Sequence, residues 1–327
     1  MNFLKLIRVK NLAFIILIQV IVRYAILYPL LAIFKTELAT GNIYFGLLVA
    51  ATVFIAAGGY IINDYFDTRI DEINKPEEVI VGKAISRKLA MTLHQLLTGV
   101  GVAIGLLLSW RAHSYAVAVI FLFIPGLLWF YSSVYKRQFL IGNIIVSLCS
   151  ALVPMTIVLF EVYFLRFKFG TEYIDNGLIR LIFNWGILFS LFAFFTTLIR
   201  ELVKDMEDEE GDRELECNTV PIVLGQFWTK VIVLALTSLT AGYMIYKFSQ
   251  YQVTIENKFV LFYFFLALIF PFLYFAITFY KAQKPGEFRL AGNIMKFIMF
   301  AGTLFTIPIY LLIAKEFAVP FFNLIIQ

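Results

Sequence analysis

Long, uninterrupted apolar blocks are the feature that most restricts what this chain can fold into. Each block has about 20 residues, enough to cross the roughly 30 Å hydrocarbon layer of a bilayer as a helix. Of all residues, 61% are hydrophobic and 15% are charged, which is far more apolar than a soluble domain. Inside a bilayer only helices and closed barrels satisfy the backbone. Because the blocks are continuously apolar rather than alternating, the sequence indicates helices.

The apolar blocks give nine candidate spans. They lie at about 11–34, 40–63, 89–110, 114–134, 139–161, 181–200, 226–247, 258–280 and 291–314. We therefore predict an all-α, polytopic membrane protein with about nine transmembrane helices in a single membrane domain, residues 1–327. Two connections, at about 64–88 and 201–225, are long and carry both signs of charge. We expect these two to be acidic cytoplasmic loops.

Basic residues divide unevenly between the two sides of the predicted bundle. On the side of the N-terminus the flanking segments hold 16 Lys and Arg residues, against 8 on the opposite side. Because the basic side of a membrane protein faces the cytoplasm, we predict a multi-pass cell-membrane protein with its N-terminus and functional site in the cytoplasm. The same asymmetry explains the net charge of +5, so no nucleic-acid partner is needed.

The first charged connection begins with an acidic motif at residues 63–71. Asp64, Asp67 and Asp71 follow i, i+3, i+7 spacing, and Asn63 precedes Asp67 by one helical turn. On a continuing helix these side chains share one face. Mg²⁺ prefers a few carboxylates together with phosphate oxygens and water. The motif therefore suits a metal-bridged phosphate ligand, although a solvated acidic helix end has the same appearance.

A second acidic motif repeats this spacing on the same predicted membrane side. Asp205, Asp208 and Asp212 are again at i, i+3, i+7. Arg200 and Lys204 share a helical face with Asp208, so cations stand beside the acids. Two such faces could each hold one Mg²⁺ and clamp a diphosphate, whose charge as a leaving group the metal would stabilise. The pairing favours this interpretation over two ordinary charged surfaces.

With these motifs the chain resembles the UbiA superfamily of intramembrane prenyltransferases. The family patterns NDxxDxxxD and DxEDxxGD are both intact here. Further similarity lies at Arg8 and Asn11, where Val9 replaces the family's proline, at residues 131–137, and at Gly142-Asn143. The resemblance covers nearly the whole chain. It implies a UbiA-type helical bundle, Mg²⁺ as cofactor with two ions, a prenyl diphosphate donor, a lipophilic acceptor and surrounding membrane lipid.

The resemblance also implies individual roles for residues of this chain. The implied metal ligands are Asp64, Asp67, Asp71, Asp208 and Asp212. The implied substrate-binding residues are Asn11, Asn63, Arg69, Lys83, Lys136 and Lys204. The implied catalytic residues are Asp67, Asp71, Asp208, Lys136 and Tyr131, with the Tyr131 ring facing an allyl cation. A cation at a cytoplasmic helix end and an aromatic at the membrane boundary also have a purely topological explanation.

The acceptor is less clearly indicated than the donor. Residues 73–76 and 219–225 resemble the digeranylgeranylglyceryl phosphate synthase branch, which attaches a geranylgeranyl chain to geranylgeranylglyceryl phosphate. Residues 77–82, Glu-Glu-Val-Ile-Val-Gly, depart from that branch because its Arg-Pro pair is missing. An aromatic quinone precursor or a tetrapyrrole therefore stays open as the acceptor.

A transporter is the alternative from a different class, with the acids as an ion site. Ionisable residues within membranes do mark transport paths. Here the acids cluster at helix ends, and the spans before them lack the glycine and proline interruptions of broken transporter helices, Gly58-Gly59 being the nearest. The pattern favours the enzyme.

Overall fold

The structure is a computed structural model, in which residues 2–74, 76–77, 79–170, 176–250, 256–317 and 319 are described. Nearly all of them are helical. In chain order the helices are α1 (Asn2–Leu6), α2 (Val9–Ile21), the π-helix η1 (Val22–Leu27), α3 (Tyr28–Ile33), α4 (Asn42–Asn74), α5 (Arg87–Arg111), α6 (Tyr115–Ser133), the 3₁₀ helix η2 (Tyr135–Arg137), α7 (Ile141–Phe169), α8 (Asn176–Glu207), α9 (Glu209–Glu214), α10 (Val220–Ser249), α12 (Lys258–Tyr263), the π-helix η3 (Phe264–Ile269), α13 (Phe270–Lys281), α14 (Pro285–Leu304) and α15 (Thr306–Phe317).

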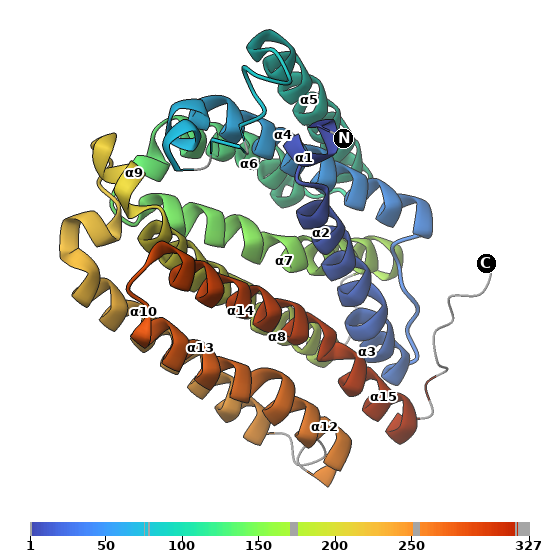
Figure 1. Ribbon diagram of the computed structural model, residues 1–327. Helices are drawn as coiled ribbons and strands as arrows, with labels where there is room; N and C mark the ends of the chain where they lie inside the picture. Colours follow the sequence, from blue (N-terminus) through green and yellow to red (C-terminus); the bar gives the residue numbers. More distant parts are fainter. Residues whose placement is uncertain are drawn as a thin grey trace.

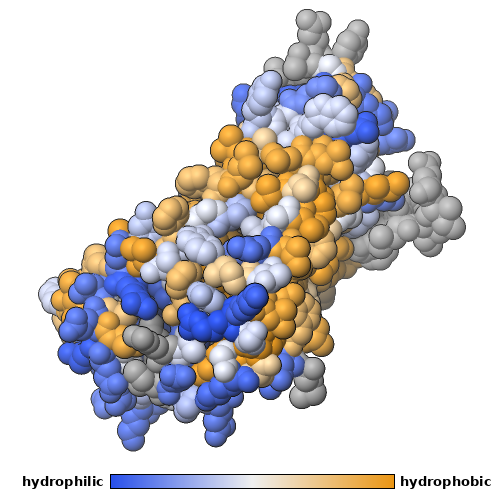
Figure 2. Space-filling model, turned by 90° about the horizontal axis from the view of Figure 1, so that it is seen from above, coloured by the Kyte–Doolittle hydropathy of each residue, from blue (hydrophilic) through white to orange (hydrophobic). Residues whose placement is uncertain are grey.

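The predicted helical membrane bundle is confirmed. Within the described residues, nine helical stretches are long and apolar enough to cross a membrane. In Figure 1 the long helices α7, α8, α13 and α14 run side by side, with α9 near one end of the bundle and α3 and α15 at the other. Figure 2 shows a broad hydrophobic band between two more hydrophilic ends. The band is the surface expected against lipid.

Two helices extend beyond their predicted blocks and carry the acidic motifs with them. α4 continues to Asn74, so the first motif is helical and not part of a loop. The motif contains no helix breaker, and the chain leaves the helix only just before Pro76, as is usual ahead of a proline. α8 likewise continues to Glu207, and part of the following connection forms α9. The predicted loops at 64–88 and 201–225 are therefore shorter, and the acids stand on helices.

Glycines let the helices that carry the first motif pack closely. A Cβ added at Gly101 of α5 would lie 3.0 Å from the Ala51 carbonyl oxygen of α4. At Gly105 it would overlap the ring of Phe121 on α6. Small residues allow transmembrane backbones to approach and gain van der Waals contact. As a result α4, α5 and α6 are held together as one block.

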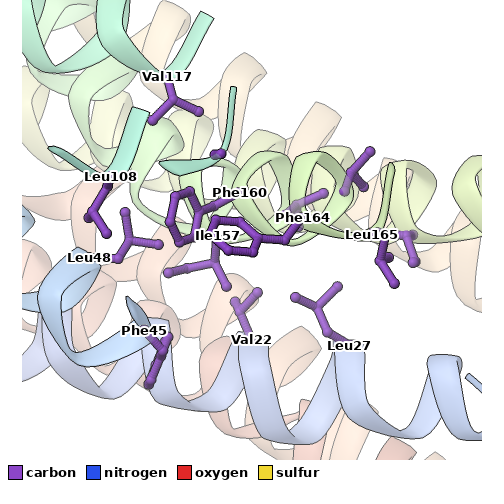
Figure 3. Packing of buried hydrophobic residues seen from close by; sticks show 14 of the residues in the cluster. Val22, Leu27, Phe45, Leu48, Leu108, Val117, Ile157, Phe160, Phe164 and Leu165 are labelled. Atoms are coloured by element: carbon purple, nitrogen blue, oxygen red, sulfur yellow. The ribbon is translucent and has the colours of Figure 1, made fainter. Parts of the chain in front are cut away.

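The buried apolar side chains form two main groups at opposite ends of the bundle. Figure 3 shows the larger one, in which Phe160 and Phe164 of α7 pack among side chains from α4, α5, α6 and η1. It lies at the end where α4 begins. The other group joins α8, α10, α13 and α14, and includes Phe272, Phe275 and Phe279. The first group fixes α4 at the end opposite its acidic motif, whereas the second, with Leu202, Val203 and Met206 of α8, packs directly beside the second motif.

Candidate active site

The first acidic motif is held by cations from two other parts of the chain. The Arg8 guanidinium donates a hydrogen bond of 2.8 Å to Asp64 Oδ1. Asn63 Nδ2 donates to Asp67 Oδ2 at 2.5 Å, and Lys136 Nζ contacts the other oxygen, Oδ1, of Asp67. Asp64 and Asp67 are thus neutralised by one arginine and one lysine in the protein alone.

Lys136 reaches Asp67 because of a tight turn after α6. It lies in η2, and the next helix begins after Leu140, whose φ of 61° places it in the left-handed region. A Cβ on Gly142 would lie 2.7 Å from Lys136 Cα and 3.0 Å from the Tyr135 carbonyl oxygen. Only glycine leaves room for α7 to begin directly against this turn. The Gly142-Asn143 pair therefore has a physical role in placing the lysine.

The second motif does not form one continuous helical face. The helix breaks at Asp208 (φ −96°, ψ 7°), and α9 starts at Glu209. Asp205, ahead of the break, accepts a hydrogen bond of 2.8 Å from Asn143 Nδ2 of α7. Asp205 nevertheless stays an electrostatic neighbour of Asp212, so the motif bends at Asp208 while its acids stay close together. Asp208 stands at the break, Asp212 lies on α9, and Asp205 joins α8 to α7.

The two motifs lie next to each other, because α9 packs against α4. Lys136 and Lys204 are electrostatic neighbours of Asp64 in the first motif. The same two lysines are neighbours of Asp212 in the second. The predicted pairing of the acidic motifs is thus found in space, with lysines between them.

The Asp212 carboxyl group has a raised pKa. Burial, and after it the nearby Asp208 carboxylate, raise the pKa of Asp212 to about 6, against the effects of Lys204, Lys136 and a hydrogen bond with Thr219. Two carboxylates this close repel each other unless a cation or a proton intervenes. A divalent cation would relieve this repulsion.

A further polar cluster joins the first helix to the site. The Asn11 side chain forms a hydrogen bond with Tyr60, and the Arg8 guanidinium lies 5.1 Å from the Tyr60 ring centroid. Tyr131 has Glu201, Lys204 and Arg8 among its electrostatic neighbours. The structure thus brings Asn11 and Tyr131, both predicted, close to this group.

Two charged residues of the candidate site were not singled out from the sequence. In the sequence Arg8 is noted only as part of a family motif, yet in the structure it pairs directly with Asp64. Its position one helical turn before Asn11 was the sequence feature that could have indicated a role in the site. Glu201 is buried and pairs with its neighbour Arg200, while interacting with Lys204. Nothing in the local sequence distinguishes Glu201 from an ordinary helix-end acid.

The remaining predicted residues are placed less centrally. Asp71 lies on α4 one turn beyond Asp67 and is partly exposed. Lys83 is exposed and donates a hydrogen bond of 3.0 Å to the Pro76 carbonyl oxygen, within its own loop. The Arg69 side chain lies outside the described residues, although its backbone belongs to α4.

The donor set fits Mg²⁺ that is shared with a phosphate ligand. Among the described residues, no group of three or more His, Cys, Asp or Glu side chains could hold a metal ion without further ligands. Mg²⁺ does not require such a group, since it keeps waters and takes phosphate oxygens alongside one or two carboxylates. Asp208 and Asp212, whose carboxylates repel each other, would be suitable oxygen donors, and so would Asp64 and Asp67 once Arg8 and Lys136 give way.

Fold and site together define a polytopic helical membrane protein with interleaved acids and bases gathered at one end of its bundle. The sequence matches the model of the UbiA prenyltransferase family over residues 26–301, and the chain belongs to that family.

Curated relatives carry the name digeranylgeranylglyceryl phosphate synthase. The one from Saccharolobus solfataricus is 36% identical over 182 residues, which cover 55% of this chain and 57% of that protein. The one from Methanobrevibacter smithii is 29% identical over 266 residues, covering 80% of this chain and 87% of that protein. The match to the first relative therefore spans less than two thirds of its length.

Solved structures show the same fold. A digeranylgeranylglyceryl phosphate synthase structure has a TM-score of 0.58 at 21% identity, over 94% of this chain and 98% of that one. A UbiA homologue from Archaeoglobus fulgidus, bound to GPP and Mg²⁺, has a TM-score of 0.53 at 15% identity, over 94% of this chain and 99% of that one. The predicted UbiA-type bundle is confirmed by these likenesses.

Proposed function

We propose that this protein transfers a prenyl group from its diphosphate to a lipophilic acceptor, using Mg²⁺ bound between the two acidic motifs. One observation carries the proposal: Asp64 on α4 and Asp212 on α9 share the neighbours Lys136 and Lys204. A metal-diphosphate ligand needs carboxylates for the metal and cations for its free phosphate oxygens. The membership of the chain in the prenyltransferase family supports the same reaction class.

Each acidic motif would hold one of two Mg²⁺ ions. Asp64, Asp67 and Asp71 would serve the first ion, and Asp208 and Asp212 the second. When bound, Mg²⁺ neutralises charge that builds up on the leaving diphosphate. The chain's own contribution is positioning: Asn63 fixes the orientation of the Asp67 carboxylate through its 2.5 Å hydrogen bond.

The lysines and the tyrosine would act on the donor. Lys136, which contacts Asp67 in the protein alone, and Lys204 would bind the diphosphate oxygens. Tyr131 lies beside Lys204, so its ring face would stand near the carbon that becomes positive as the bond to diphosphate breaks. The acceptor oxygen or ring carbon then attacks that carbon and loses its proton.

The prenyl tail would lie in an apolar seam between helices. A cavity of about 30 Å³ is lined almost entirely by apolar side chains of α2, η1, α7, α8 and α14, with Phe14 of α2 and Phe192 and Thr196 of α8 among them. Thr196 precedes Lys204 by two helical turns, which is about 12 Å along α8. The cavity therefore lies toward the membrane interior from the lysines. A long tail would have to widen it by moving Phe14 or Phe192.

We propose geranylgeranyl diphosphate as the donor and geranylgeranylglyceryl phosphate as the acceptor. The names of the curated relatives support this pair. The altered stretch at residues 77–82 keeps an aromatic quinone precursor as the second acceptor to test. We further propose that residues 1–327 form one membrane domain, and that the N-terminus and the acidic end face the cytoplasm, on the basis of the basic-residue asymmetry.

The function is tested with purified protein, geranylgeranyl diphosphate and Mg²⁺, measuring diphosphate release and the masses of products. Geranylgeranylglyceryl phosphate and 4-hydroxybenzoate are supplied as competing acceptors. We expect a prenylated lipid product, and we expect Asp67→Asn and Asp208→Asn to reduce turnover by at least about a hundredfold. Product formed only on the aromatic ring would overturn the acceptor assignment but not the prenyl transfer.

Neighbouring acids supply matched controls. Glu72→Gln removes an exposed carboxylate next to Asp71, and Glu210→Gln removes one on α9 close to Asp208. Each control changes the net charge by the same amount as its test variant. If the test and control variants lose turnover equally, the acidic motifs act only through general electrostatics and the two-motif metal site is wrong.

A further inference from the structure

A second site lies at the opposite end of the bundle from the acidic motifs. There the structure contains a cavity of about 350 Å³ between the loop before α4, the end of α5 and the end of α7. Its lining is Ala39, Tyr44, Trp110, Arg111, His113, Phe164, Phe167 and Lys168. We propose that this cavity binds the phosphate headgroup of an anionic membrane lipid.

The cavity is distinct from the candidate active site. Tyr44 lies near the start of α4, and Asp64 lies 20 residues further along the same helix. At 1.5 Å per residue these positions are about 30 Å apart, the thickness of the hydrocarbon layer. A ligand bound here cannot touch the acids, so this site belongs to the other leaflet.

The charge of the cavity selects an anion. Arg111, the last residue of α5, and Lys168, near the end of α7, both line it and are exposed. None of its described lining residues is acidic. A guanidinium and an ammonium carried by residues that line one cavity can both bind phosphate oxygens.

The aromatic walls favour a lipid over a free anion. The Trp110 side chain is 66% exposed and that of Phe167 is 60% exposed. Each directly precedes a cation in the sequence, and the Arg111 guanidinium lies 4.9 Å from the Trp110 ring centroid. Exposed aromatics at the end of a membrane span lie at the headgroup level. An inorganic ion would leave this apolar surface uncovered, whereas the glycerol and upper acyl chains of a lipid would cover it.

Contacts within the protein hold the cavity walls in place, so a ligand does not have to order them. The His113 ring stacks on Phe167, with centroids 4.5 Å apart and planes inclined by 19°. His113 also has a φ of 49°, a left-handed conformation that turns the chain sharply after α5. Phe164, which lines the cavity, also packs into the large core cluster shown in Figure 3, so the α7 wall is anchored in the core.

A buried ion pair fixes the remaining wall, the loop that contains Ala39. Glu161 of α7 accepts a hydrogen bond of 2.5 Å from the Ala39 amide. Arg23 donates one of 2.6 Å to the Thr40 carbonyl oxygen and lies 4.0 Å from Glu161. Both charged side chains are almost completely buried. The loop is therefore positioned before any ligand arrives, which favours binding because little ordering is left to occur.

The proposal is tested by native mass spectrometry of the full chain in detergent, after equilibration with equal amounts of phosphatidylglycerol and phosphatidylcholine. We expect wild-type protein to retain one phosphatidylglycerol that Arg111→Gln/Lys168→Gln protein loses, with its preference for that lipid reduced by about tenfold or more. Arg111→Lys/Lys168→Arg should keep the lipid, since both charges remain. The gel-filtration profile should be the same for all variants, because both side chains are exposed.

Lys247→Gln/Lys258→Gln is the matched control, with the same loss of charge at the same end of the bundle, on α10 and α12. Equal lipid retention by the control and by Arg111→Gln/Lys168→Gln would overturn the proposal. Sodium phosphate is also compared with sodium chloride of equal ionic strength. If phosphate alone displaces the retained lipid, the cavity is a free-anion site and the lipid assignment is wrong.

Discussion

Arg8 on the N-terminal segment and Asp64 on α4 form a 2.8 Å ion pair, although they are 56 residues apart in the sequence. The Asp64 side chain is only 17% exposed, so loss of its partner would leave a largely desolvated carboxylate. The pair therefore fixes the entry of the first helix and places a positive charge against a proposed metal ligand.

We predict that Arg8→Gln will raise the KM for the prenyl diphosphate by about tenfold. The reason is that Asp64, a proposed metal ligand, loses its charge-assisted hydrogen bond from Arg8. The substitution should also lower stability by about 1–3 kcal/mol, since Asp64 loses its partner. Diphosphate release and thermal unfolding in detergent measure the two effects. Lys10→Gln, at an exposed neighbouring position, should do neither. An unchanged KM for Arg8→Gln would show that Arg8 is only structural.

Lys136 gives a prediction with two opposite effects. In the protein alone Lys136 contacts Asp67, and it therefore competes with a metal for that carboxylate. Lys136→Gln should bind Mg²⁺ more tightly without donor, yet turn over the donor about a hundredfold more slowly because a diphosphate partner is missing. Isothermal titration and steady-state turnover measure these separately. Arg137→Gln is the control, and weaker Mg²⁺ binding by Lys136→Gln would contradict the competition.

The sequence predicted the bundle and the pairing of the acidic motifs because both depend on local patterns. Apolar block length fixes the number of spans, and helical spacing aligns Asp64, Asp67 and Asp71. The break at Asp208 was not predictable in this way, because the i, i+3, i+7 pattern continues through it. Nor was the hydrogen bond from Asn143 to Asp205, since it joins two helices across 62 residues.

Turn geometry leads to a third prediction, at Gly142. An added methyl group would lie 2.7 Å from Lys136 Cα, so Gly142→Ala must displace the turn that carries the lysine. We expect turnover to fall by about tenfold to a hundredfold, as small misplacements of a catalytic group do, with the fold retained. Gly126→Ala is a suitable control because its methyl group would meet nothing within 4 Å. Full activity of Gly142→Ala would show that the lysine position is not critical.

The acidity of Asp212 predicts how Mg²⁺ stabilises the protein at different pH. Its pKa rises from 3.8 to about 6 in the fold. Between these values the folded chain holds a proton that the unfolded chain has released, so metal-free stability falls as pH rises through this window. Above about pH 6 the carboxylate is ionised, and Mg²⁺ binding should recover the loss.

We therefore expect Mg²⁺ to raise the thermal unfolding midpoint by several degrees at about pH 7.5 and by little at about pH 5. Thermal unfolding with and without Mg²⁺ at both pH values measures this. Asp212→Asn should remove most of the difference between the two pH values. Equal stabilisation of the wild type at both would contradict a role for Asp212 as a metal ligand.

Phe192 and Gly302 give a paired prediction about donor length. A Cβ on Gly302 of α14 would overlap the Phe192 ring, which lines the apolar cavity. Phe192→Ala should enlarge the cavity, whereas Gly302→Ala should push the ring further into it. The ratio of kcat/KM for geranylgeranyl over farnesyl diphosphate should therefore rise in the first variant and fall in the second, each by about tenfold.

The opposite signs separate this explanation from a general loss of packing. Both substitutions disturb the same contact and both are expected to lower stability, so a nonspecific effect would change the ratio in one direction or leave it unchanged. Phe297→Ala, on the same helix as Gly302 but 52% exposed, removes a comparable ring on the lipid side and should leave the ratio as it is. Movement of the ratio in the same direction for Phe192→Ala and Gly302→Ala would place the prenyl tail elsewhere in the bundle.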